Sequence, residues 1–222
     1  MSSRLGAIAL ALLLTALPGV ASAAYRSPQV LVSGTALQSF FTSQGQLISV
    51  ASAQLDAQRF NLAFGAPFQV LPILSPTAGI GVYNATPPSP PLYQVYPGAA
   101  SPGWTAFASF QPTDRLVVNL FDALNVLQGT ITYVGADRTD FGFYASLPGG
   151  IAYSQDARNA GGRAQMLAFN GTGVRAGLTW FAFESTPGPG GDFADAVVLV
   201  NLTVAAVVAT NSTWGRVKSL YR

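Results

Sequence analysis

The sequence predicts an all-β fold, an antiparallel β-sandwich of the jelly-roll type with at most one short helix, near residues 35–43. Three observations lead to this prediction. Short stretches rich in β-branched and aromatic residues recur at intervals of roughly 8 to 12 residues, each bounded by Gly, Pro or Ser. Several of them alternate apolar and polar residues, which is the period of a half-buried strand. Cysteine is absent, so the core must supply the stability that disulfides give to many exported domains.

The expected strands follow one another along most of the chain. They cover residues 29–33, 47–51, 68–74, 79–84, 104–110, 115–121, 129–134, 140–146, 165–170, 178–184 and 198–204. The last of these is rich in valine, which favours sheet over helix. Helix is expected only over residues 35–43, where Leu37, Phe40 and Phe41 have helical spacing and Gly45 ends the pattern.

A proline-rich stretch separates the fourth and fifth expected strands. Residues 84–104 read NATPPSPPLYQVYPGAASPGW, and their six prolines lack the N–H groups that a central strand needs. We therefore expect a surface loop or an edge segment here. It serves either as a rigid connection across one end of the sandwich or as a polyproline ligand for an aromatic groove.

The first 23 residues have the features of an export signal. Arg4 precedes a short apolar run over residues 8–17, and Ala21-Ser22-Ala23 forms a small-residue cleavage site. We expect a mature chain that starts at Ala24, with one sandwich domain over 24–205 and a C-terminal tail over 206–222. No later stretch is long and apolar enough to span a bilayer. The expected destination is extracellular, with the periplasm as the alternative, and the lack of cysteine favours a bacterial exoprotein.

The charge pattern limits the class of partner. The formal net charge is +2 and no run of Lys or Arg occurs, whereas nucleic-acid binding needs a clustered positive surface. The expected partner is instead a polymer of the extracellular matrix or envelope, including polysaccharide.

The residue inventory excludes most familiar catalytic mechanisms. The chain contains no histidine and no cysteine, which rules out Ser-His-Asp and Cys-His catalysis and histidine-bound zinc. The remaining enzymatic alternative is a carboxylate pair, as in glycoside hydrolysis. The candidate pairs are Glu184 with Asp192 or Asp195, and Asp137 with Asp140.

The same carboxylates form a candidate cation site. Calcium takes six to eight oxygen ligands from carboxylates and carbonyls, and the acids lie next to turns at the expected strand ends. The candidate calcium ligands are Asp137, Asp140, Glu184, Asp192 and Asp195. The alternative is that these acids only close their turns, in which case the protein needs no cofactor.

Aromatic side chains provide a candidate carbohydrate site. Trp104, Trp214, Tyr93 and Tyr96 would stack on sugar rings if they are exposed. The alternative is that the rings in or beside strands belong to the core.

The stretch GGDFADAVVLV, residues 190–200, resembles the closing motif of a family of secreted bacterial domains of unknown function. The motif of that family is D-x-D-[FY]-[ND]-D followed by apolar residues, preceded by strands similar to FGFY at 141–144 and FE at 183–184. The resemblance implies a β-sandwich with a calcium role for the acidic turn. Asp192 matches the second acid and Asp195 the last, while Gly190 and Ala194 replace two oxygen donors.

Members of this family often occur in exoproteins that carry a Pro-Glu-Pro (PEP-CTERM) sorting signal. This chain ends NSTWGRVKSLYR, without such a signal, so we expect no retention by that route. Taken together, the sequence predicts a non-catalytic exported β-sandwich with a structural or adhesive role in the matrix or envelope, and with a weak calcium site. A carbohydrate-binding module and a carboxylate-dependent glycosidase are the alternatives.

Overall fold

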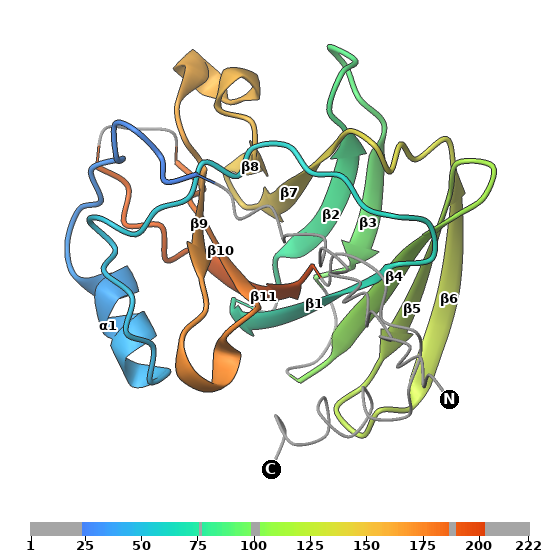
Figure 1. Ribbon diagram of the computed structural model, residues 1–222, viewed down its shortest axis with the longest axis horizontal. Helices are drawn as coiled ribbons and strands as arrows, with labels where there is room; N and C mark the ends of the chain where they lie inside the picture. Colours follow the sequence, from blue (N-terminus) through green and yellow to red (C-terminus); the bar gives the residue numbers. More distant parts are fainter. Residues whose placement is uncertain (1–23, 76, 99–102, 187–189, 203–222) are drawn as a thin grey trace, which may run out of the picture.

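The computed structural model in Figure 1 describes residues 24–75, 77–98, 103–186 and 190–202. These residues form eleven strands, one α-helix and three short 3-10 helices. The strands make two antiparallel sheets that face each other, which confirms the predicted all-β sandwich with one short helix. The expected export signal over 1–23 and the tail over 206–222 lie outside the described residues.

The larger sheet has seven strands in the order β6-β5-β4-β1-β11-β10-β9, and the smaller has four in the order β3-β2-β7-β8. Within each sheet, strands that are neighbours in sequence are mostly joined as hairpins, so the likeness to a jelly roll is limited to the two-layer arrangement. The strands are β1 (Pro67–Leu74), β2 (Gly79–Asn84), β3 (Leu92–Tyr96), β4 (Thr105–Gln111), β5 (Arg115–Phe121), β6 (Leu127–Val134), β7 (Phe141–Leu147), β8 (Gly150–Tyr153), β9 (Met166–Asn170), β10 (Thr179–Phe183) and β11 (Ala196–Asn201).

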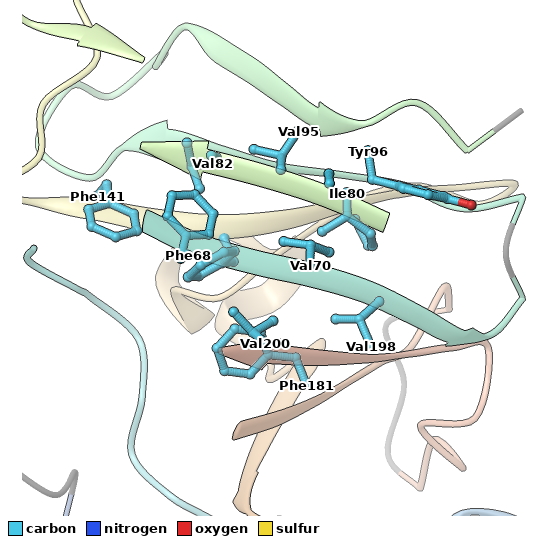
Figure 2. Packing of buried hydrophobic residues seen from close by; sticks show 14 of the residues in the cluster. Phe68, Val70, Ile80, Val82, Val95, Tyr96, Phe141, Phe181, Val198 and Val200 are labelled. Atoms are coloured by element: carbon cyan, nitrogen blue, oxygen red, sulfur yellow. The ribbon is translucent and has the colours of Figure 1, made fainter. Parts of the chain in front are cut away.

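The main core fills the space between the two sheets (Figure 2). Val198 and Val200 of β11 point into this core, whereas Val197 and Leu199 point to the opposite face of the sheet and are buried there as well. Successive side chains of a strand lie on opposite faces, so a strand made almost wholly of apolar residues requires both faces to be covered.

A second core covers the outer face of β9, β10 and β11. The helix α1 (Ala36–Ser43) supplies Phe41, whose ring lies 5.7 Å from that of Trp180 and 5.1 Å from that of Phe169. The indole nitrogen of Trp180 donates to Gln46 Oε1 at 3.2 Å, so this buried polar group is satisfied. The predicted helix is confirmed, and its role is to close this outer face.

The expected strands over 29–33 and 47–51 are wrong. Both segments are irregular, and glutamine side chains take the place of a partner strand. Val30 N donates to Gln54 Oε1 at 2.7 Å, and Gln54 Nε2 donates to Val30 O at 2.8 Å. Gln38 bonds to Ile48 O and Val50 N in the same way, at 2.8 and 3.0 Å. An amide side chain can therefore satisfy an apolar segment that belongs to no sheet.

Two short strands were not expected from the sequence. β3 forms inside the proline-rich stretch, at the edge of the smaller sheet, which agrees with the predicted edge segment. β8 is only four residues long. β6 was expected to be half-buried, but it lies at one edge of its sheet and is exposed along almost its whole length. β9, at the other edge of the same sheet, is buried, because the second core covers its outer face. None of the helices in the described part of the chain is long and apolar enough to cross a bilayer.

Candidate functional site

The turn between β10 and β11 contains three of the five predicted ligand acids. Glu184 directly follows β10 and is buried, and its two carboxylate oxygens each accept a backbone N–H: Oε1 from Thr186 and Oε2 from Phe193, both at 3.1 Å. Asp195 Oδ2 accepts from Ser185 N at 2.6 Å, and Asp192 Oδ1 accepts from Ala194 N at 2.9 Å. The observed contacts of these carboxylates close the turn.

Phe193 explains why this turn needs such support. Its φ is 54°, in the left-handed region that a bulky side chain rarely adopts, and its ring is almost fully buried. The bond from its N–H to Glu184 helps to hold this unfavourable conformation. Gly191 lies against the same carboxylate, since a Cβ there would come within 2.5 Å of Glu184 Oε2.

The carboxyl groups of Glu184 and Asp195 influence each other, and their pKa values shift in opposite directions. Burial raises the pKa of Glu184 against the effect of the Thr186 and Phe193 amides, and the nearby Asp195 raises it further. Burial also opposes the charge of Asp195, but hydrogen bonds from Ser185 and Glu184 outweigh it and lower the pKa of Asp195.

Asp140 and Asp137 lie before β7 and make a different set of contacts. The Arg59 guanidinium binds both oxygens of Asp140, with Nε to Oδ1 at 2.7 Å, and Thr86 Oγ1 donates to Oδ2 at 2.6 Å. The hydrogen bond from Arg59 is the main reason that the pKa of Asp140 is lowered. Asp137 Oδ1 accepts from the backbone and the hydroxyl of Thr139 at 2.8 and 2.6 Å, which is a local turn.

The five predicted calcium ligands do not form one site. Asp140 precedes β7, whereas Gly149, just beyond the other end of β7, lies against the Ser185 carbonyl beside Glu184. A strand of seven residues spans roughly 23 Å at 3.3 Å per residue. Within the described residues, no group of three or more Asp and Glu side chains is arranged to hold a metal ion. Calcium binding stays a prediction.

The aromatic residues predicted to stack on sugars are mostly part of the core. Tyr96 is fully buried between the sheets (Figure 2), and Tyr93 is buried with its hydroxyl donating to Gly135 O at 2.6 Å. Trp104 is partly buried against the same core, and Trp214 lies outside the described residues. Protein covers both tyrosine rings, so the structure does not offer them as a stacking surface.

The structure contains a surface groove of about 620 Å³ that the sequence analysis did not predict. The acidic turn borders it through Gly190 and Phe193, and charged groups of both signs line it, including Arg26 and Asp156. Arg26 Nη2 donates to Asp156 Oδ1 at 2.9 Å, although the two residues are 130 positions apart in the chain. No local sequence signal brings such residues together. The groove offers donors and acceptors next to apolar surface, as the hydroxyls of a polar ligand require.

Comparison with known proteins adds no relative. No protein-family model matches the chain, and no curated protein matches it. The resemblance to the family of secreted domains therefore stays a hypothesis that rests on the motif around Asp192 and Asp195.

Proposed function

We propose that this protein is a non-catalytic exported β-sandwich that acts as a structural or adhesive component of an extracellular matrix or envelope. The observation that carries the proposal is the way the acids are used. Backbone N–H groups donate to Glu184 and Asp195, and the Arg59 guanidinium donates to Asp140. These carboxylates therefore make contacts that stabilise the fold. In a chain without histidine and cysteine, this supports a role in which shape and surface matter more than chemistry.

The contacts of Glu184 and Asp195 also favour a non-catalytic role over a glycosidase. A retaining enzyme keeps its two carboxyl groups about 5 Å apart and an inverting enzyme wider still, with the sugar between them. Here Glu184 accepts hydrogen bonds from the backbone N–H groups of Thr186 and Phe193, and Asp195 accepts one from Ser185. A substrate would have to displace these backbone groups before it could reach the carboxylates.

The composition of the chain indicates how such a protein would adhere. Only 9% of its residues are charged, so ion pairs can contribute little to contact with a polymer. Adhesion would depend on apolar and hydrogen-bonding groups, which salt screens much less than it screens charges. We therefore expect the protein to bind to isolated matrix material in a manner that is nearly independent of salt.

Cosedimentation tests this expectation. The protein recovered from the medium of an expressing bacterium is mixed with insoluble matrix material and centrifuged at low and at high sodium chloride concentration. The proposal expects most of the protein in the pellet under both conditions. Recovery in the supernatant, or release by salt alone, would contradict it, as would turnover of a glycoside that Glu184→Gln abolishes.

A saccharide-binding role is the second candidate, and the groove beside the acidic turn favours it. Arg26 and Asp156 place donors and acceptors there next to Val30 and Phe193. The same assay separates the two functions when soluble polysaccharide is added. The polysaccharide would release the protein from the pellet only if the protein binds the matrix through a saccharide site. Release by polysaccharide would favour the second candidate.

A further inference from the structure

The strand β6 forms one edge of the seven-stranded sheet, on the side of the molecule away from α1 (Figure 1). Its inner side pairs with β5, from Arg115 opposite Val134 to Phe121 opposite Leu127. In the described part of the chain, no backbone hydrogen bond reaches its other side. β6 therefore presents a row of N–H and C=O groups to the outside.

The pairing with β5 identifies which backbone groups face outward. Gly135 N donates to Asp114 O at 2.7 Å, and this bond extends the β5–β6 register by one residue. In an antiparallel ladder, hydrogen-bonded pairs alternate with non-bonded pairs. Between Gly129 and Tyr133 the odd-numbered residues of β6 therefore bond to β5, and the N–H and C=O groups of Thr130 and Thr132 point away from the sheet. The register shifts between Leu120 and Phe121, so this rule does not extend to Leu127.

The side chains of β6 are uncharged and mostly exposed, and several of them are apolar. The exposed fractions of Leu127, Ile131 and Val134 are 52%, 47% and 72%, and Leu124 and Val126 in the preceding hairpin are exposed as well. Residues 123–134 contain no charged residue and no proline. Natural proteins usually protect a long edge with charges, proline or a bulge near its centre, because an open apolar edge pairs with other chains.

The other three sheet edges in the described residues are protected in this way. At β9, Leu55 N donates to Ala168 O at 2.8 Å and covers the edge. At β8, the Asn159 side chain bonds to both N and O of Tyr153, at 2.8 and 2.9 Å. β3 is five residues long and has a proline directly before and after it. Among the four sheet edges in the described residues, β6 is the one that lacks such protection.

We propose that β6 pairs in antiparallel fashion with β6 of a second copy of this chain and joins the two seven-stranded sheets into one. A second copy suits this edge because an uncharged strand meets an identical strand without repulsion and without burying an unpaired charge. The other described edges are covered or flanked by proline, so β6 is the edge that a second copy offers for pairing. Such a contact is two-fold symmetric, and assembly stops at the dimer.

The face of each residue follows from the same geometry. Residues that are opposite each other in an antiparallel pair share a face of the sheet, so Ile131 of both copies lies on the side of the main core. The exposed part of Ile131 then contacts apolar groups of the second copy. Thr130 and Thr132 lie on the opposite face, where their hydroxyls stay in water.

Cross-linking tests the pairing directly, because the natural chain contains no cysteine. In a two-fold strand pair centred on this region, one of Thr130, Ile131 and Thr132 lies opposite its own copy. Single variants Thr130→Cys, Ile131→Cys and Thr132→Cys are oxidised mildly beside Val174→Cys, which places an exposed cysteine in the short 3-10 helix between β9 and β10, at the other end of the seven-stranded sheet. We expect one β6 variant to form a covalent dimer at least tenfold faster than Val174→Cys. Equal rates in all four variants would overturn the proposal.

Sedimentation velocity gives a second readout on the unmodified protein. We expect a dimer for the natural chain and for Val174→Lys. We expect a monomer with an unchanged circular dichroism spectrum for Ile131→Lys, because the pairing would bring two like charges together on one face of the joined sheet. A natural chain that is monomeric at every concentration would overturn the pairing. The inference rests on the proposed structural role, but the two fail separately. If the natural chain is a monomer but still sediments with the matrix, only the proposed pairing of β6 is contradicted. If it is a dimer but stays in the supernatant, only the proposed adhesion is contradicted.

Discussion

Replacement of Glu184 by alanine tests whether the acidic turn is a folding element. The change removes the acceptor of the Phe193 N–H, which is buried and has no access to water. An unpaired buried donor costs about 1 to 3 kcal/mol. The Thr186 N–H also loses its partner, but it is exposed and regains water at little cost. Removal of a buried carboxylate gives back part of the loss, so we expect a destabilisation in the lower half of that range, about 1 to 2 kcal/mol.

Asp192→Ala is the matched control in the same turn. Asp192 is exposed and accepts one hydrogen bond, from Ala194 N at 2.9 Å. A surface change of this kind costs about 0.5 kcal/mol or less. Urea denaturation measures both variants, and the midpoint should fall clearly for Glu184→Ala with an unchanged m value, and hardly at all for Asp192→Ala.

The same experiment in calcium and in chelator separates a turn from a metal site. If the acids only close the turn, the difference between the two variants is the same in both buffers. Equal losses for Glu184→Ala and Asp192→Ala, or a loss that occurs only in calcium, would refute the reasoning. Calcium coordination would then explain the turn better than hydrogen bonds to the backbone.

Two other predictions concern the opposite end of β7 and the packing of the small sheet. Arg59 lowers the pKa of Asp140 below its ordinary value of 3.8, so the stability from this pair is present above pH 3.8 and is lost as the pH falls through the lowered pKa. The free energies of unfolding of the natural chain and Arg59→Gln should therefore converge in acid, and a constant difference across pH would contradict this. Gly81→Ala would place a Cβ 2.4 Å from the Tyr93 carbonyl oxygen and should cost about 1 to 3 kcal/mol in thermal or urea unfolding, whereas Gly129→Ala enters open space and should cost nothing. Equal effects of the two alanines would show that the strands can move apart.

The sequence by itself determined the class of the fold and the position of most strands. The alternation within β5, the β-branched and aromatic residues of β7 and β11, and the helical spacing of Leu37 and Phe41 depend only on neighbours a few positions away. The missing histidine and cysteine likewise limit the chemistry that is open to this chain in any fold. These properties are local or compositional, so no knowledge of the path of the chain is needed to find them.

Only the tertiary structure decided which of these residues meet. It placed Asp140 next to one end of β7 and Glu184 near the other end. It also turned Tyr96 into the core and paired Arg26 with Asp156, which is 130 positions away in the chain. It also decided that residues 29–33 bond to a glutamine side chain while β6 stays open at one edge. The physical reason is that such contacts depend on the order of strands in the sheets, and that order comes from burial of the whole core rather than from any short stretch of sequence.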